Sequence, residues 1–104
     1  MRYHLVLAPD AARALQALPA RQRAEVRDAL ERHLRNEPAK TSRSRIKRLR
    51  GLRRPQYRLR INEIRVFYDV TETTVEILAI VSKSEAQEWL GEAGTPDDGG
   101  AGEG

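Results

Sequence analysis

Apolar and basic residues alternate between positions 57 and 61, where the odd positions are apolar or aromatic and the even positions are Arg58 and Arg60. A period of two residues is typical of a β-strand with one buried face. Residues 64–70 and 74–81 are also rich in β-branched and aromatic side chains, and Asn62-Glu63 is a connection of hairpin length. The pattern therefore predicts an antiparallel meander of three strands over 57–61, 64–70 and 74–81.

The first part of the chain follows a helical period. Val26, Leu30 and Leu34 recur every four residues, which predicts one apolar stripe on a helix that starts near Pro19 and runs to about Asn36. An earlier helix contains Leu15 and Leu18, with Asp10 as its expected N-cap. These two helices are expected to form an antiparallel hairpin that covers the sheet.

Short elements complete the pattern at both ends. Residues 2–8 form an apolar run that predicts a first strand, and residues 84–90 predict a short final helix. The expected fold class is α+β, with a strand, a helical hairpin, a three-stranded antiparallel meander and a C-terminal helix. The expected domain is 1–90, and the Gly-rich, acidic residues 91–104 are expected to be a disordered tail.

The register of the predicted hairpin gathers arginines on one face. With a turn at Asn62-Glu63, Arg60 lies opposite Arg65 and Arg58 lies opposite Phe67. Like charges directly opposite each other destabilise a sheet by about 0.2–1 kcal/mol. A binding site for an anion would explain why the chain keeps two arginines opposite each other despite this cost. Apolar residues expected on the same face, as an interaction strip, are Phe67, Leu78 and Ile80.

A basic run leads into this hairpin. Ten Lys or Arg residues and no acid lie between positions 40 and 60, in a chain whose formal net charge is +4. A basic strand can position groups against a particular phosphate, so nucleic acid is the leading candidate ligand. The residues expected to bind RNA are Arg45, Lys47, Arg48, Arg50, Arg53 and Arg54.

Composition narrows the remaining function classes. The 104 residues have room for one domain, and the chain has no cysteine that could form a disulfide or a thiolate zinc site. His4 and His33 have no carboxylates at ligand spacing, and no P-loop, dinucleotide fingerprint or Ser/His/Asp signature is present. We therefore expect no metal and no cofactor. No apolar run is long enough to span a membrane, so a cytoplasmic location is expected.

The basic and apolar motifs together resemble the RelE/ParE superfamily of bacterial toxins. The resemblance is carried by Leu49-Arg50-Gly51, by Tyr57-Arg58-Leu59-Arg60 and by Arg65-Val66-Phe67-Tyr68, and the order of elements over residues 1–90 agrees with it. It implies a toxin of a type II toxin–antitoxin module. RelE-type members cut mRNA in the ribosomal A site, whereas ParE-type members poison DNA gyrase.

In RelE-type nucleases the cleavage residues are basic, and three of them correspond to Arg58, Arg60 and Arg65. The pattern also has an arginine and a tyrosine near the C-terminal helix. This chain departs from it there, because the arginine position holds Ser84 and the tyrosine position holds Leu90. Arginine effectively never releases its proton, so another group must transfer protons. Lys83, at the end of the third strand, is the best-placed candidate.

Three readings stay open. The first is a ribosome-dependent, metal-independent mRNA endonuclease with ribosome and mRNA as partners. The second is a gyrase inhibitor, and the third is a catalytically silent member that only binds its antitoxin. In each case a cognate antitoxin is the expected partner, bound through Phe67, Leu78, Ile80 and Trp89. Trp89 is expected to anchor the last helix on the sheet as well.

Overall fold

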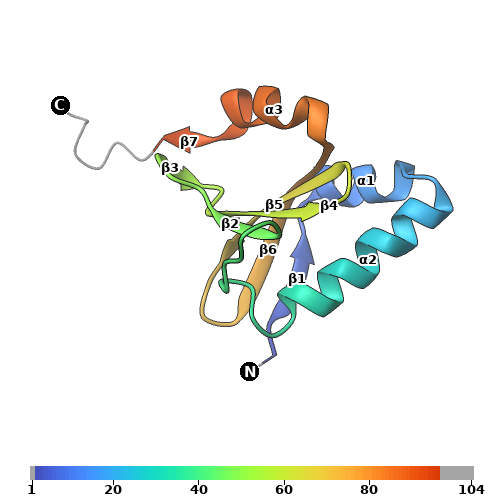
Figure 1. The fold of residues 1–104 in the computed structure, drawn as a ribbon, viewed down its shortest axis with the longest axis horizontal. Helices are drawn as coiled ribbons and strands as arrows, with labels where there is room; N and C mark the ends of the chain where they lie inside the picture. Colours follow the sequence, from blue (N-terminus) through green and yellow to red (C-terminus); the bar gives the residue numbers. More distant parts are fainter. Residues whose placement is uncertain (1, 97–104) are drawn as a thin grey trace.

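The computed structural model describes residues 2–96 (Figure 1). Their elements follow the order β1 (His4–Leu7), α1 (Pro9–Ala17), α2 (Ala20–Leu34), β2 (Ile46–Arg48), β3 (Leu52–Arg54), β4 (Tyr57–Ile61), β5 (Ile64–Val70), β6 (Thr74–Ser82), a single 3-10 turn η1 (Lys83–Glu85), α3 (Ala86–Ala93) and β7 (Thr95–Pro96). The α+β class and the expected order of the main elements are confirmed.

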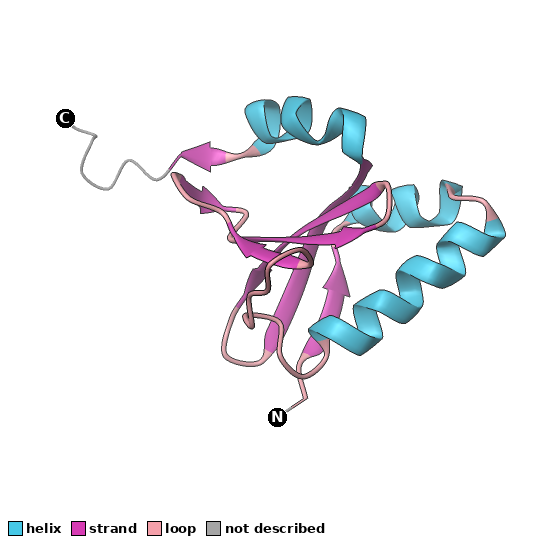
Figure 2. Cartoon of the chain, in the orientation of Figure 1, coloured by secondary structure: helices cyan, strands magenta, loops and turns pink. Residues whose placement is uncertain are grey.

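The main sheet has five strands in the order β1-β6-β5-β4-β2. Strand β1 runs parallel to β6, and the other neighbours are antiparallel. Helices α1 and α2 cover one face of this sheet, while α3 lies over the other face (Figure 2). Strands β3 and β7 form a separate pair beside α3.

The core lies between the sheet and the helical hairpin. The expected α2 stripe of Val26, Leu30 and Leu34 is buried there, and Leu59 and Val66 meet it from the sheet with no exposed surface. Burial of one such side chain contributes about 1.5–3 kcal/mol, so this face fixes which side of β4 and β5 faces inward. The arginines of β4 and β5 consequently lie on the opposite face of the sheet, the face over which α3 lies.

The β4–β5 register agrees with the expected one at every pair, including Arg60 opposite Arg65 and Arg58 opposite Phe67. The turn that closes this hairpin places Asn62 at φ 52°, a left-handed conformation that asparagine tolerates better than most residues. The meander prediction is therefore confirmed.

A bulge corrects the expected register of the third strand. Phe67 pairs with Ala79 and Tyr68 pairs with Ile77, so Leu78 is an extra residue in β6. Because side chains alternate along a strand, the bulge turns Ile80 to the core face, where it is 5% exposed. The expectation that Ile80 lies beside the arginines is wrong, and the small side chain of Ala79 takes that place.

Two expectations at element ends are also corrected. Helix α1 begins at Pro9 with Ala8 as its N-cap, and Asp10 instead forms an ion pair with Arg13 in the first turn. Residues 91–96, expected in a disordered tail, complete α3 and form β7. The remaining residues of that expected tail, 97–104, lie outside the described residues.

The sequence pattern missed the strands inside the basic run. Strand β2 pairs with β4 and extends the sheet, with Ile46 buried opposite Leu59 and Lys47 opposite Arg58. The alternation Arg45-Ile46-Lys47 carries this strand, but one apolar residue among many cations is a weak signal. Strand β2 ends the sheet and places further cations beside the arginines of β4.

Candidate nucleic-acid interface

A cleft of about 270 Å³ lies between the α3 side of the sheet and α3 itself. Strands β4 and β5 supply Arg58 and Arg65, and the start of η1 supplies Lys83. The other lining residues are uncharged: Leu49, Phe67, Ala86, Gln87 and Leu90. No carboxylate lines the cleft within residues 2–96, so its charge is entirely positive.

Arg65 is fixed at the floor of the cleft. Its side chain is only 8% exposed, and its Nη1 donates hydrogen bonds to the backbone carbonyls of Asn62 at 2.7 Å and Ile64 at 3.1 Å. These neutral acceptors hold the guanidinium in one orientation without neutralising it. Arg65 therefore presents a fixed and uncompensated positive charge.

Arg58 is held less completely. Its Nε is buried and has no hydrogen-bond partner among the described residues. Burial lowers the pKa of the Arg58 guanidinium, and the charges of Arg65 and Arg60 lower it further. A buried donor without an acceptor costs about 1–3 kcal/mol. An anion in the cleft would offset the repulsion between the arginines.

Lys83 is placed by the backbone. Its amide donates a 2.7 Å hydrogen bond to the carbonyl of Glu63 in the β4–β5 turn, which ties the start of η1 to the arginine hairpin. Ser84, at the position where the superfamily pattern has arginine, contacts Ser82 instead, whereas Leu90 does line the cleft. Lys83 is thus the one cleft-lining group, within the described chain, that is neither arginine nor uncharged.

Other side chains that could transfer a proton lie outside the cleft. Tyr57 and Tyr68 stack on each other on the core side of the sheet, with ring centroids 5.5 Å apart. The Tyr68 hydroxyl donates to the Pro38 carbonyl at 2.7 Å, and burial raises the pKa of Tyr68 above its ordinary range. Glu85 accepts a hydrogen bond from Ser82 and lines a different hollow.

Arg60 does not line the cleft. It lines a separate hollow of about 310 Å³ with Ser44, Arg45 and Asn62, which we call the Arg60 hollow. The sequence grouped Arg58, Arg60 and Arg65 as one site. The structure brings Arg58 and Arg65 together with Lys83 and places Arg60 beside them, on the side toward β2.

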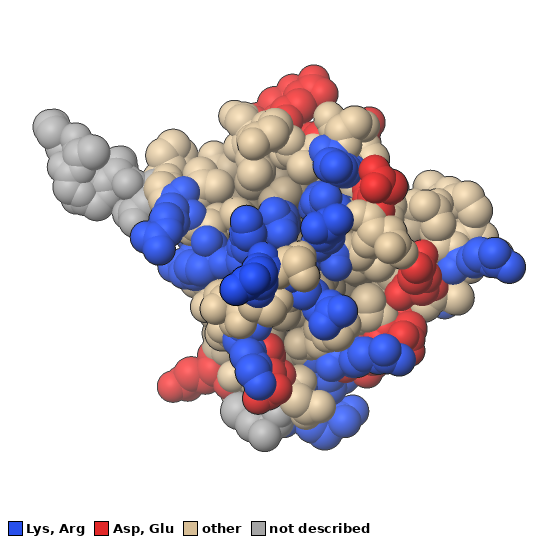
Figure 3. All heavy atoms as spheres, in the orientation of Figure 1, with Lys and Arg blue, Asp and Glu red and all other residues tan. Residues whose placement is uncertain are grey.

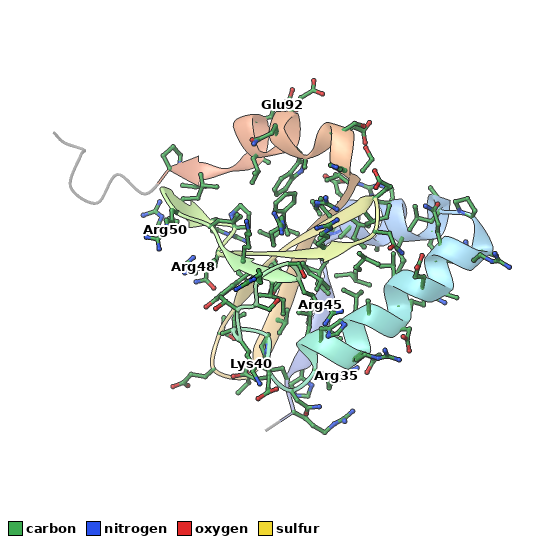
Figure 4. All side chains as sticks on the ribbon, viewed as in Figure 1. Arg35, Lys40, Arg45, Arg48, Arg50 and Glu92 are labelled. Carbon is green, nitrogen blue, oxygen red and sulfur yellow. The ribbon has the colours of Figure 1, made fainter. Side chains whose placement is uncertain are left out.

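The residues expected to bind RNA fall into two groups. Arg45, Lys47, Arg50 and Arg53 are exposed, and basic side chains gather over the centre of the face drawn in Figure 3, with acidic ones toward its rim. Arg48, which is labelled in Figure 4, and Arg54 have partners within the protein. Among residues 2–96 no carboxylate forms an ion pair with the first group, so its side chains can contact phosphates.

The partners of the second group differ in kind. Arg48 lies over the Tyr57 ring, 5.3 Å from its centroid, and donates to the Gln56 carbonyl. Arg54 pairs with Asp69 at 2.7 Å and Glu76 at 3.0 Å. Two carboxylates pair with Arg54, so a phosphate would have to compete with them for the RNA contact expected of this residue. Arg54 ties β3 to β5 and β6.

The expected apolar strip for an antitoxin is not open. Phe67 has no exposed surface because Trp89 stacks on it, with centroids 5.0 Å apart and an angle of 11° between the rings. The anchoring role of Trp89 is therefore supported, while Phe67 and Ile80 are inaccessible as long as α3 stays in place. Leu78 is half buried at the bulge.

The sequence reasoning missed a third basic hollow, at the end of α2. It has a volume of about 330 Å³, and Arg32, His33, Lys40 and Arg45 are among its lining residues. The signal that could have found it is the presence of Arg32 before and Lys40 after the segment around Pro38, which follows the end of α2 at Leu34.

Among residues 2–96 there is no group of three or more His, Asp or Glu side chains that could hold a metal ion. None of the helices in the same range is long and apolar enough to cross a membrane.

Comparisons with known proteins agree on the family. The family model described as "ParE toxin of type II toxin-antitoxin system, parDE" matches residues 5–87. A comparison with curated protein sequences gives no match. A solved structure of the toxin–antitoxin complex RelBE2 from Mycobacterium tuberculosis contains a chain that is 27% identical, with a TM-score of 0.56 over 79% of this chain and 99% of that one.

Two more distant structures share the fold. The YoeB dimer from Staphylococcus aureus is 18% identical with a TM-score of 0.57, and the alignment covers 78% of this chain and 97% of that chain. The RelB–RelE antitoxin–toxin complex from Methanococcus jannaschii is 16% identical with a TM-score of 0.54, covering 82% and 98%. From the extent of the family match, the chain belongs to the ParE toxin family of type II toxin–antitoxin systems, within the RelE/ParE superfamily.

Proposed function

We propose that this toxin is a ribosome-dependent endonuclease that cuts mRNA and thereby stops translation in the cytoplasm. The observation that carries the proposal is the cleft itself. Arg58, Arg65 and Lys83 converge there without an acid, and the buried Nε of Arg58 lacks an acceptor. A phosphate is the anion that fits this cluster of cations, because guanidinium groups bind phosphate through directed hydrogen bonds.

The reaction that suits these residues is attack by the 2′-hydroxyl of the RNA on its own phosphate. The 2′-oxygen forms a bond to phosphorus while the bond to the 5′-oxygen breaks, and negative charge grows on the phosphorane. Arg58 and Arg65 stabilise that charge, which is often the largest single contribution to catalysis. The products are a 2′,3′-cyclic phosphate and a free 5′-hydroxyl.

Lys83 completes the proposal as the proton donor. Its ammonium group can protonate the leaving 5′-oxygen, and the arginines cannot take this role. None of the described residues that line the cleft is a base that could accept the 2′-hydroxyl proton. We infer that this acceptor comes from outside the chain, which gives a physical reason for a requirement for the ribosome.

The lining of the cleft gives a physical reason for the two departures from the superfamily pattern, at Ser84 and Leu90. Lys83 reaches the cleft from the residue next to Ser84, and Leu90 contributes an apolar wall where the pattern has a tyrosine. An apolar wall excludes water and strengthens the electrostatic interactions of the arginines. The remaining groups can thus support phosphate binding and proton donation.

The second candidate function is inhibition of DNA gyrase. The description of the matching family model favours it, since that model is named for ParE toxins. Under this reading the basic face would bind a protein or DNA target and the cleft would have no turnover. A cognate antitoxin is proposed as the partner in both cases.

An induction experiment separates the two candidates. The chain is expressed from a tight promoter, and protein synthesis and plasmid supercoiling are followed in the same culture. The proposal expects incorporation of labelled amino acids to stop first, with new mRNA 5′ ends. Arg58→Ala should abolish both effects, whereas Arg13→Ala, an exposed control on α1, should not. Loss of supercoiling before any change in translation would favour the gyrase reading.

A further inference from the structure

The three basic hollows form a connected series on the surface. Arg45 lines both the Arg60 hollow and the hollow at the end of α2, which we call the His33 hollow. Arg60 in turn lies opposite Arg65, which lines the cleft. In Figure 4, Arg45 lies close to the end of α2, so the series runs from α3, across the sheet and toward that helix end.

The spacing of the strands sets the length of this series. Neighbouring strands lie about 4.8 Å apart, so the step from β5 to β2 through β4 is about 10 Å. Arg65 lies on β5 and Arg60 on β4, and Arg45 directly precedes β2. The backbone amide of Arg60 also donates to the Arg45 carbonyl at 2.9 Å, which fixes the two residues side by side.

The charges along the series are available to an outside anion. No carboxylate among residues 2–96 forms an ion pair with Arg45 or Arg60. In the His33 hollow, Arg32 pairs with Asp28 at 3.3 Å and Lys40 pairs with Glu37 at 3.8 Å. Both pairs are exposed, and such pairs contribute only about 0–1 kcal/mol, so a phosphate can compete for these cations.

The chemistry of the lining suits a polynucleotide rather than a small anion. Hydroxyl and amide groups of Ser44 and Asn62 accompany the arginines of the Arg60 hollow. Thr41, Ser42 and Asn36 accompany the cations of the His33 hollow. Such mixtures of cations and short polar side chains contact phosphate and sugar groups in nucleic-acid complexes. A chain of evenly spaced negative charges can fill all three hollows at once.

We propose that single-stranded RNA runs from the cleft through the Arg60 hollow and over the β2 edge into the His33 hollow, where it seats a phosphate. The proposal rests on the proposed function in one respect, that the cleft holds the first phosphate. It extends that function by assigning a binding path to the flanking RNA. Arg60 then holds the neighbouring phosphate, and Arg45 guides the strand around the edge of the sheet.

Length-dependent binding tests this path. The probes are a trinucleotide and a nonanucleotide of 2′-O-methyl RNA, which cannot be cut because the 2′-hydroxyl is blocked. The trinucleotide can fill only the cleft and its neighbour, whereas the nonanucleotide can reach the His33 hollow. Affinities are measured by NMR titration and fluorescence anisotropy, with the full chain and at several salt concentrations.

Arg32→Gln, which changes a residue of the His33 hollow alone, should weaken binding of the nonanucleotide about fivefold at 0.1 M salt, because each lost phosphate contact on a single strand lowers the logarithmic salt slope by about 0.7. The trinucleotide should lose less than twofold. Arg21→Gln is the matched control, since it removes the same charge from an exposed site at the other end of α2. It should change neither affinity beyond the small effect of net charge.

His33 supplies an independent local readout. Burial lowers its pKa, the charges of Arg45 and Arg32 lower it further, and Asp28 opposes them. Lys40 and Glu37 face the same hollow from the loop after α2. A phosphate seated there should raise the pKa of His33, seen in its ring NMR signals with the nonanucleotide and not with the trinucleotide.

Three results would overturn the proposal. The first is no binding of the nonanucleotide by the wild-type chain. The second is an equal loss for both lengths in Arg32→Gln, and the third is a loss no larger than that of the Arg21→Gln control. These results are independent of ribosomal cleavage. A chain that shows the length effect without cutting mRNA would keep the path and lose the proposed function.

Discussion

Replacing Arg58 with methionine should make the protein more stable while removing its activity. Methionine keeps the apolar stem of the side chain and removes the buried Nε that has no partner. It also removes a charge whose pKa is lowered by burial and by Arg65 and Arg60. An unpaired buried donor costs about 1–3 kcal/mol, and partial burial of Arg58 favours the lower end.

We therefore expect the free energy of unfolding to rise by about 1 kcal/mol, which for a domain of this size raises Tm by about 4–8 °C. The gain should shrink at high salt, because screening weakens the repulsion between arginines in the wild-type protein. Urea unfolding at two salt concentrations measures both effects.

Arg65→Met is the contrasting variant. Arg65 donates to two backbone carbonyls and is nearly buried, so its loss leaves both acceptors without this donor. We expect a decrease of about 2 kcal/mol in the free energy of unfolding. If Arg58→Met lowers the free energy of unfolding by 1 kcal/mol or more, the argument that the Arg58 guanidinium destabilises the folded protein is refuted.

Three further predictions concern residues outside the arginine pair. Trp89→Ala removes the ring that covers Phe67 and should cost about 2–3 kcal/mol in a urea titration, with faster amide exchange in α3; unchanged exchange would contradict the anchoring role. Arg54→Met should lower the free energy of unfolding by about 1 kcal/mol without changing RNA affinity. Arg53→Met should weaken RNA binding at unchanged stability. The reverse pattern in filter binding would contradict the view that Arg54 acts within the protein and Arg53 on RNA. His33 has a lowered pKa in the folded state, so the unfolded chain binds more protons below about pH 6.5 and stability should fall from pH 7 to pH 5. His33→Gln should flatten that pH dependence, and an unchanged slope would refute it.

The sequence predicted the elements whose local signals agree with the packing. The β4–β5 hairpin has strict alternation and a two-residue turn, and each neighbouring pair is then forced by the buried face. The α2 stripe was predicted for the same reason, since three aliphatic residues recur at one helical spacing. These two patterns were enough to predict that Arg58 and Arg65 lie on the same face of the sheet, opposite the helical hairpin.

The features that the sequence did not predict depend on contacts between distant segments. The bulge at Leu78 leaves no mark in the pattern, because residues on both sides of it are apolar. Strand β7 pairs with β3 after a close approach at Gly94, where a Cβ would lie 2.6 Å from the Leu90 carbonyl oxygen and 3.3 Å from Leu52. The separation of Arg60 from the cleft depends on where β2 and α3 lie, and neither position is encoded in β4 itself.

The central claim is that the cleft cuts RNA on the ribosome, and the nature of the cut ends tests it most directly. Purified ribosomes stalled on a defined mRNA, with an empty A site, are mixed with the toxin. A parallel reaction without toxin controls for contaminating nucleases. The account predicts a single cut in the exposed codon, a 2′,3′-cyclic phosphate on the upstream fragment, and at least a hundredfold slower cutting by Arg58→Ala, about 2.7 kcal/mol of transition-state stabilisation. Intact mRNA under these conditions, together with inhibition of purified DNA gyrase by the same preparation, would contradict it.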